Sequence, residues 1–371
     1  MAESLAVAFR VDASTLIGSG HVMRCLTLAG ALTEKGARCY FVMRQKPGSL
    51  ADAVRSRGHQ VLMLSSAGAE QSASDFENEP LHASWLGVSW ETDASDTLQA
   101  LKGKELDWLV VDHYALDHRW ESRVGGCCQR LMAIDDLADR KHQCDVLLDQ
   151  NLGREPRDYD GLLPGHTRRL IGSDHALLRP EFARARALSL QARQSREPGN
   201  ILVSMGGVDA ANVTVDVLRV LDTIEIGASY RVTVVLGAAC PNINEVVEQA
   251  ESMHLDSRVL VNANNMAELM SQADLAIGAA GGSAWERCCL GLPSLLVVMA
   301  ENQRPGAEAL KQAGASISLG WPDAIEETLP RAVREVFEAG RLLEMSQNAA
   351  AICDGLGVQR VIDALTEVPD D

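Results

Sequence analysis

The sequence has few aromatic residues, no long apolar run and no basic leader. Aromatic residues make up 4% of its 371 residues, which argues against a surface that recognises polymers by stacking. The longest apolar stretches, such as 294–300, fall far short of the roughly 20 residues that span a bilayer. Residues 1–10 run directly into a strand pattern, so no signal peptide is predicted and a cytoplasmic location is expected.

Basic residues are in the minority, because 34 Lys and Arg stand against 51 Asp and Glu, for a formal net charge of −17. Such a surface repels nucleic acid and anionic lipid unless a basic patch forms locally. Only short basic pairs such as Arg168–Arg169 occur. Neither nucleic acid nor a membrane is expected as a partner, whereas an anionic small molecule can still bind at helix N-termini.

Metal-binding and disulfide patterns are also missing. The nine cysteines are odd in number, include two adjacent pairs and form no Cys-x-x-Cys motif, which is typical of reduced thiols in a cytoplasmic enzyme. The acidic pair Asp135–Asp136 and the segment 139–142 lack the spacing of a ligand cluster and are interpreted as loop structure. No metal and no cofactor are predicted.

Short apolar runs alternate with longer amphipathic stretches, which is typical of parallel α/β architecture. The expected strands are 6–11, 38–43, 59–64, 108–111, 131–134 and 146–148, then 201–204, 230–236, 258–261, 275–277, 294–298 and 316–319. Two halves of similar length predict two Rossmann-like domains. A turn signal at 197–199 places their boundary near residue 195, giving domains 1–195 and 196–371. Two helical segments, 324–345 and 347–366, are expected to end the chain.

The densest motif is FRVDASTLIGSGHVMRC at 9–25. A strand is expected to end at about Val11, with a glycine-containing turn and a helix that opens near His21. Gly18 and Gly20 would let the backbone approach a ligand closely. No third glycine completes a dinucleotide fingerprint, and no lysine completes a P-loop.

Three polar residues near strand ends have open interpretations. An imidazole at His21 could accept a proton near neutral pH, or it could merely cap the helix. Asp12 could orient His21 or hold a sugar hydroxyl, although a turn-forming role is the simpler explanation. Asp112 and Tyr114 end another strand at the edge where α/β sites lie, or they are plain loop residues.

Two further glycine-rich turns lie in the second half. Gly206 and Gly207 follow a strand and precede a helix, which a tight connection would explain equally well. The segment GAAGGSAWER at 278–287 places Ser283 and Glu286 after a strand. Such a turn can bind a diphosphate through its N–H groups, and a carboxylate there can accept both hydroxyls of a ribose. Together with Asn302–Gln303, this segment favours a ligand site over ordinary helix capping.

These motifs together resemble the UDP-2,4-diacetamido-2,4,6-trideoxy-β-L-altropyranose hydrolases of the pseudaminic acid pathway. The similar segments are 18–24, 204–209, 278–288 and 300–303, with further similarity at 111–114 and 134–151, so most of the chain to about residue 320 is covered. The stretch 65–96 departs from the family by being longer and more polar. The resemblance implies a GT-B-like fold with the site in the cleft between two Rossmann-like domains, related to the glycosyltransferase that makes lipid II.

The resemblance implies release of UDP and a free 2,4-diacetamido sugar without a metal, and a monomer is expected. His21 would be the base that activates water, Glu286 and Asn302 would bind the UDP, and Tyr114 and Asp12 would line the sugar side. The other residues expected to bind substrate are Gly18, Gly20, Arg24, Gly206, Gly207, Gly281, Gly282, Ser283 and Gln303. UDP is a good leaving group, so one base would suffice where ordinary glycosidases need paired carboxylates.

Three alternatives fit the same residues. A glycosyltransferase of this fold would pass the sugar to an acceptor rather than to water, and fold alone does not separate the two. A hydrolysing UDP-sugar 2-epimerase would differ in product stereochemistry. A nucleotide-sugar-binding regulator without activity would have no need of a base at His21.

Overall fold

In a computed structural model of the chain, the structure describes residues 4–66, 79–225, 230–338 and 340–367. The chain divides into two compact units, Met1–Leu177 with Val358–Asp371, and Leu178–Gly357. Helix α5 (Pro180–Arg193) belongs to the second unit because it packs against helices there, and Arg193 donates to Ala273 O at 2.7 Å. The division therefore falls earlier than the expected boundary near residue 195.

The first unit contains a seven-stranded parallel sheet in the order β3-β2-β1-β4-β5-β6-β7. Its strands are β1 (Ala6–Val11), β2 (Arg38–Arg44), β3 (Gln60–Leu64), β4 (Trp108–Asp112), β5 (Arg130–Ile134), β6 (Val146–Asp149) and β7 (Arg168–Ile171). The central strands β1 and β4 are buried along their whole length. Burial on both faces explains why they read as continuous apolar runs rather than as alternating patterns.

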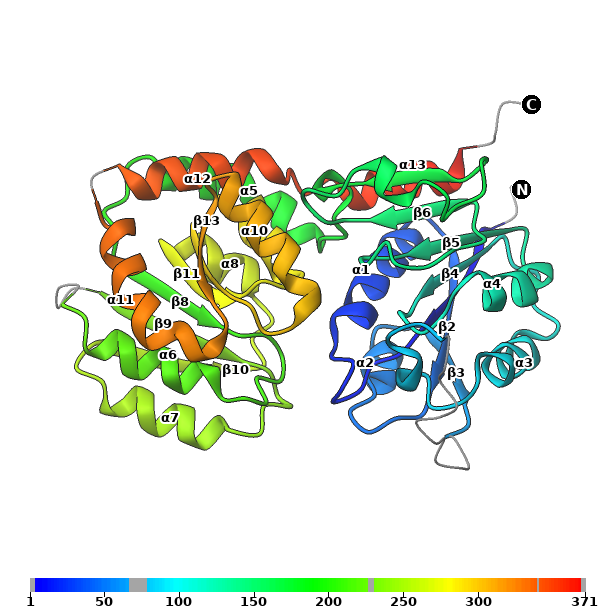
Figure 1. The fold of residues 1–371 in the computed structure, drawn as a ribbon, viewed down its shortest axis with the longest axis horizontal. Coiled ribbons are helices and arrows are strands. Elements are labelled where there is room, and N and C mark those ends of the chain that lie inside the picture. The colour runs from blue at the N-terminus through cyan, green and yellow to red at the C-terminus, as the bar shows by residue number, and fades with distance from the viewer. Residues whose placement is uncertain (1–3, 67–78, 226–229, 339, 368–371) are drawn as a thin grey trace. The chain divides into compact units, whose positions relative to one another are not determined.

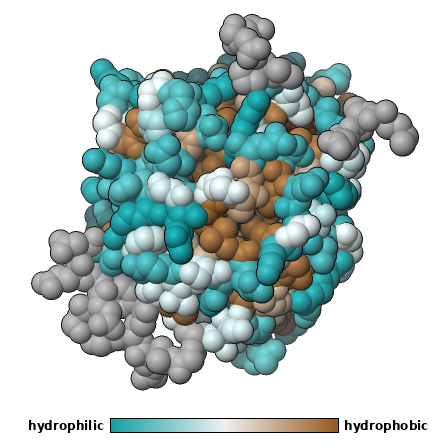
Figure 2. Space-filling model, turned by 90° about the vertical axis from the view of Figure 1, so that its right-hand side faces the viewer, coloured by the Kyte–Doolittle hydropathy of each residue, from teal (hydrophilic) through white to brown (hydrophobic). Residues whose placement is uncertain are grey.

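Helices cover both faces of this sheet (Figure 1). They are α1 (Gly20–Glu34), α2 (Ala51–Ser56), α3 (Trp90–Leu101), α4 (His118–Val124) and α13 (Gly357–Thr366). One core cluster joins the sheet to α1, α2 and α13, and another joins it to α3 and α4. Among the described residues, α3 and α4 share the second face with side chains from connecting segments, such as Leu116 and Tyr159. Figure 2, which looks onto this side of the first unit, shows apolar side chains that reach the surface among polar ones.

The second unit repeats the architecture with a six-stranded parallel sheet in the order β10-β9-β8-β11-β12-β13. Its strands are β8 (Asn200–Ser204), β9 (Arg231–Leu236), β10 (Asp256–Val261), β11 (Leu275–Ala279), β12 (Ser294–Val297) and β13 (Ser316–Gly320). Its helices after α5 are α6 (Val213–Asp222), α7 (Ile243–Ser252), α8 (Met266–Gln272), α9 (Ser283–Cys289), α10 (Arg304–Gln312), α11 (Ile325–Val336) and α12 (Arg341–Ile352). One apolar cluster packs α6, α7 and α11 on this sheet.

All the expected strands occur, and β7 occurs in addition. β7 is an edge strand that opens with Arg168 and Arg169, so it lacks the apolar run by which strands are recognised. The chain ends in three helices rather than two. Gly340 and Gly355 both adopt φ of 82°, a left-handed conformation that interrupts helices.

The last helix returns to the first unit. Val361, Ile362 and Leu365 of α13 are buried in the first-unit core, and Trp108 Nε1 donates to Leu365 O at 3.0 Å. The expected second domain, 196–371, therefore loses its final helix to the first unit. In the part of the chain that the structure describes, no helix combines the length and apolarity needed to cross a bilayer.

Candidate functional site

In the first unit, candidate residues gather at the carboxyl-terminal edge of the sheet. Strand order reverses between β1 and β4, which lie side by side. Loops that leave such neighbouring strands diverge, and doubly wound folds bind ligands there. His21 follows β1, whereas Asp112 ends β4 and Tyr114 follows it, so the fold brings together residues that are far apart in sequence.

The loop before His21 is held by its own hydrogen bonds. Ser14 Oγ accepts from the backbone N–H of Ile17 at 3.0 Å, and Gly18 N donates to Ser14 O at 2.8 Å. Gly18 has φ of 81°, which favours glycine. A Cβ at Gly20 would meet no atom within 4 Å. The fold itself therefore does not require glycine at position 20, which leaves close approach of a ligand as a reason for it.

His21 and Asp112 form a buried pair. His21 Nδ1 lies 2.6 Å from Asp112 Oδ1, and the Asp112 side chain has no exposed surface. Burial alone would raise the pKa of Asp112, but Arg24 and His21 together hold that pKa well below its usual range. An ionised carboxylate accepts the proton of Nδ1, which fixes the imidazole tautomer. The lone pair of Nε2 is then available to accept a proton, as in the base of a catalytic triad.

Arg24 and Asp136 extend this network. Arg24 donates from Nε and Nη2 to the two oxygens of Asp112, both at 2.7 Å, and its Nη1 lies 2.8 Å from Asp136 Oδ2. The Tyr114 hydroxyl donates to Asp136 Oδ2 at 2.5 Å, and its ring meets the His21 ring edge-on at 4.6 Å. Burial and Asp136 raise the pKa of Tyr114 well above its usual value, so this donor stays protonated. Arg24 thus supports the pair rather than presenting a free charge.

Asp12 belongs to a separate network of buried charges. Its carboxylate accepts from Arg10 Nη1 at 2.8 Å and from the backbone N–H of Arg44 at 2.7 Å. Arg10 also binds Asp93, and all three side chains lack exposed surface. These contacts hold β1, β2 and α3 together. A direct contact between Asp12 and a ligand would require them to break, at the cost of leaving a charge buried without its partner.

The acidic pair Asp135–Asp136, interpreted from sequence as loop structure, is part of the site network. Asp136 binds Arg24 and Tyr114, and Asp135 accepts from the Tyr159 hydroxyl at 3.0 Å. A sequence signal existed, because acidic residues close three neighbouring strands at one edge: Asp112 and Asp149 end β4 and β6, and the pair directly follows β5. Comparing the residues at the ends of these three strands would have indicated that the acidic side chains lie near one another.

In the second unit, the loops after β8, β11 and β12 meet at the carboxyl edge of the other sheet. β8 and β11 are neighbours where strand order reverses, and a Cβ on Gly278 would lie 2.6 Å from Ser204 O. Gly206 has φ of 103°, and a Cβ on Gly237 would collide with Gly207 O at 2.1 Å. The backbone therefore explains the glycines at 206 and 237, and the Gly207 carbonyl lies directly against Gly237.

The turn from β11 to α9 is packed differently. A Cβ at Gly282 would meet nothing within 4 Å, and one at Gly281 would meet only Gln303 Nε2, at 3.5 Å. Glu286 Oε1 accepts from Arg179 Nη2 at 3.2 Å, and burial raises the pKa of Glu286 although Arg179 opposes this. The structure thus brings the 281–286 turn beside Gln303. Asn302 is exposed in the same short turn as Gln303, η6 (Glu301–Gln303).

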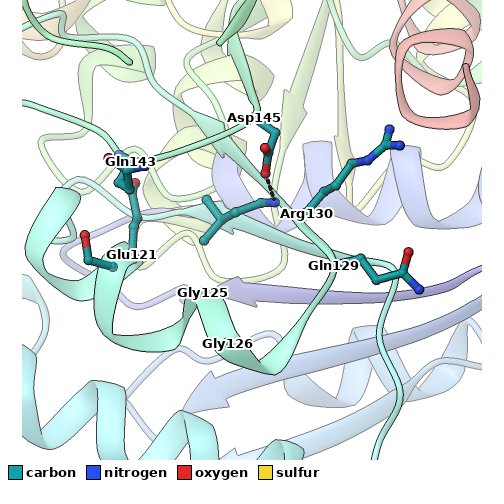
Figure 3. A pocket seen from close by; sticks show the side chains of 9 residues that line it. Glu121, Gly125, Gly126, Gln129, Arg130, Gln143 and Asp145 are labelled. Carbon is teal, nitrogen blue, oxygen red and sulfur yellow. Dashed lines mark hydrogen bonds between the residues drawn. The ribbon is translucent and has the colours of Figure 1, made fainter. Parts of the chain in front are cut away.

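The first unit also has a cavity of about 360 Å³, away from the carboxyl-terminal edge of its sheet (Figure 3). It is lined by residues that include Glu121, Gly125, Gly126, Gln129, Arg130, Gln143 and Asp145. These residues lie around the start of β5 and directly before β6, at the amino-terminal edge of the sheet. Its carboxylates already have protein partners, since Asp145 accepts from Leu131 N and Glu121 accepts from Gln143 N. We assign no chemistry to it.

Comparison with known proteins places these sites in context. Residues 200–361 match the glycosyltransferase family 28 C-terminal domain. The chain is 28% identical to the spore coat polysaccharide biosynthesis protein SpsG of Bacillus subtilis, over 73% of this chain and 79% of that protein. It is 24% identical to the UDP-2,4-diacetamido-2,4,6-trideoxy-β-L-altropyranose hydrolase of Campylobacter jejuni, over 84% of this chain and 98% of that protein.

Solved structures give the fold. The crystal structure of MurG from Acinetobacter baumannii matches with a TM-score of 0.70 at 14% identity, over 98% of this chain and 100% of that chain. The calicheamicin glycosyltransferase CalG4 matches with a TM-score of 0.60, also at 14% identity, over 99% and 100% of the two chains. The chain therefore has the GT-B glycosyltransferase fold of two parallel-sheet, Rossmann-like domains, and its residues 200–361 match the C-terminal domain of glycosyltransferase family 28.

Proposed function

We propose that this chain hydrolyses a UDP-linked 2,4-diacetamido-2,4,6-trideoxy sugar to UDP and the free sugar. The observation that carries the proposal is the pair of His21 and Asp112, in which a buried carboxylate lies 2.6 Å from Nδ1 of an imidazole at the ligand-binding edge of the sheet. The similarity to the Campylobacter jejuni hydrolase, along nearly the whole of that protein, supports the choice of reaction and of sugar.

The reaction needs one base. His21 Nδ1–H donates to Asp112, and Nε2 takes a proton from water as the water oxygen bonds to the anomeric carbon. The bond between that carbon and the UDP oxygen breaks, and its electron pair leaves with UDP. The diphosphate is a stable anion, so no second carboxylate is required to protonate it. His21 then returns its proton to solvent.

In the same proposal, residues of the second unit bind the UDP. Backbone N–H groups of the turn at 281–283 face the diphosphate, with Gly206 and Gly207 beside them, and Glu286 accepts the ribose hydroxyls. Open space around Gly282 supports this assignment, since packing alone does not explain a glycine there. Asn302 and Gln303 come from the turn beside Gly281 and complete the set.

Glu286→Gln is expected to raise the Kd for UDP about tenfold or more. A hydrogen bond to a charged group is worth roughly 1.5–3 kcal/mol, and about 1.4 kcal/mol is tenfold in affinity. Calorimetric titration with UDP measures the change. Glu308→Gln is the matched control, because Glu308 lies on α10, is half-exposed and pairs with Lys311. Equal affinity of both variants for UDP would contradict the assignment of Glu286 to the UDP site.

A glycosyltransferase is the second candidate, and the match to family 28 and the MurG-like fold favour it. It would use the same UDP site and the same base, but a hydroxyl of an acceptor would replace water. The two reactions differ in whether UDP is released when no acceptor is present.

UDP release from the purified chain, without added acceptor or metal, therefore tests the proposal. UDP-2,4-diacetamido-2,4,6-trideoxy-β-L-altropyranose and UDP-GlcNAc are compared in parallel, in water enriched in ¹⁸O. We expect release from the first substrate only, with no ¹⁸O in the UDP, because the bond that breaks is the one to the anomeric carbon. Retained UDP binding with no release from either sugar would favour the transferase.

A further inference from the structure

An aromatic cluster lies beside the base and is not explained by the residues assigned so far. A short turn, η2 (Ala83–Trp85), lies between β3 and α3 in the stretch where the sequence departs from the family pattern; residues 67–78 of that stretch lie outside the described residues. The ring centroids of His82 and Trp85 are 4.3 Å apart. They lie 5.4 Å and 5.7 Å from the ring of Tyr114, which also meets the ring of His21 edge-on. Four rings thus form one continuous group that ends at the base.

Tyr114 itself offers little surface to a ligand. It is 4% exposed, and its hydroxyl is already bound to Asp136. His82 and Trp85 are only half-buried. Surface available to a sugar beside His21 is therefore provided by these two rings more than by Tyr114, to which the resemblance gave that contact.

Core packing does not account for Trp85. Trp90, five residues later, packs against the apolar cluster under α3 and α4, whereas Trp85 does not belong to that cluster. A partly buried Trp outside that cluster leaves part of its ring open to a ligand, as aromatic residues of ligand-binding surfaces do. Neighbouring groups hold the turn in place, because Leu86 is buried and its carbonyl accepts from Lys46 Nζ at 3.0 Å.

The chemistry of the two rings is that of an uncharged wall. Burial lowers the pKa of His82 from its usual value, so its imidazole is neutral at neutral pH. Neutral aromatic faces bind C–H and methyl groups well and hydroxyl groups poorly. A 2,4-diacetamido-6-deoxy sugar carries three methyl groups, whereas N-acetylglucosamine carries one methyl group and a hydroxymethyl.

We propose that His82 and Trp85 form the wall of the sugar subsite and select sugars that carry methyl and acetamido groups over more hydroxylated ones. This inference rests on the proposed function for the identity of the nucleotide, UDP. It concerns binding of the sugar, however, and holds whether water or another acceptor receives that sugar.

Binding measurements on the full chain test the inference. All variants carry His21→Ala so that the ligand is not consumed, and calorimetry gives the Kd of UDP, UDP-GlcNAc and the UDP-diacetamido-trideoxy sugar. Trp85→Ala is expected to weaken binding of the last ligand by about tenfold to a hundredfold, the range that apolar pocket contacts provide. Its affinities for UDP and UDP-GlcNAc change much less. His82→Ala is expected to shift the preference in the same direction.

Trp90→Ala is the matched control, since it removes a Trp of the same region that packs on the core and lies against Arg119. Thermal unfolding establishes that each variant is folded, and Trp85→Phe, which keeps a ring, should retain most of the preference. An unchanged sugar preference in folded Trp85→Ala would overturn the inference. So would equal Kd values for UDP and both UDP-sugars in the chain that carries only His21→Ala, because the sugar would then contribute nothing to binding. Failure of the hydrolase proposal would appear separately, as absent UDP release by the chain with His21 intact.

Discussion

His21→Ala is expected to lower turnover of the UDP-sugar by roughly 10²–10⁴-fold, the usual worth of a general base. The loss should lie in kcat, because His21 is proposed to act on water, whereas residues of the second unit are proposed to bind the UDP. The local structure should persist, since Arg24 still holds both oxygens of Asp112 at 2.7 Å. Steady-state UDP release and calorimetric UDP binding, measured on the same preparation, separate the two effects.

His59→Ala provides the control for the loss of a largely buried imidazole. His59 precedes β3 at the opposite edge of the same sheet, where its ring lies 5.4 Å from that of Phe41. We expect this variant to retain turnover. His21→Gln, which can still form a hydrogen bond but cannot act as a base, should be as impaired as His21→Ala. Full activity in either His21 variant would exclude the base assignment.

Asp112→Asn is expected to lower turnover by a similar factor, roughly 10²–10⁴-fold, by analogy with amide replacement of the acid in a triad. Asp112 receives three nitrogen donors, two from Arg24 and one from His21, beside the weaker Cys25 thiol. An amide has a single acceptor oxygen, so it cannot satisfy all three. Either the amide N–H reverses the imidazole tautomer and removes the lone pair from Nε2, or a buried guanidinium N–H loses its partner.

The second outcome would also lower stability, so activity and thermal unfolding must be measured together. Asp117→Asn is the matched control, because Asp117 caps α4 by accepting from Arg119 N at 2.9 Å and lies outside the His21 network. It should cost some stability and little activity. If Asp112→Asn turned over substrate at the normal rate, the orienting role of the carboxylate would be wrong.

Much of the fold could be predicted because buried parallel strands carry continuous apolar runs. β1 and β4 are such strands, and the sequence located both. β7 was missed because an edge strand that begins with Arg168 and Arg169 has no such run. The domain division was placed too late because the turn signal at 197–199 follows α5, whereas Arg186 and Arg193 of α5 bind backbone carbonyls of the second unit. The local sequence pattern does not indicate which backbone carbonyls an arginine side chain will bind in the folded chain.

The sequence by itself determined the α/β class, the glycine-rich turn before His21 and the turn that carries Glu286, since these depend on residues close together in the chain. Only the tertiary structure decided the partners. Asp112 lies 91 residues from His21 in the chain and is hydrogen-bonded to it in the fold. Asp136 likewise pairs with Arg24, and Asp12 pairs with Arg10 in the core. Trp85 stacks near Tyr114. The physical reason is that strand order, rather than chain order, determines which loops share an edge of a parallel sheet.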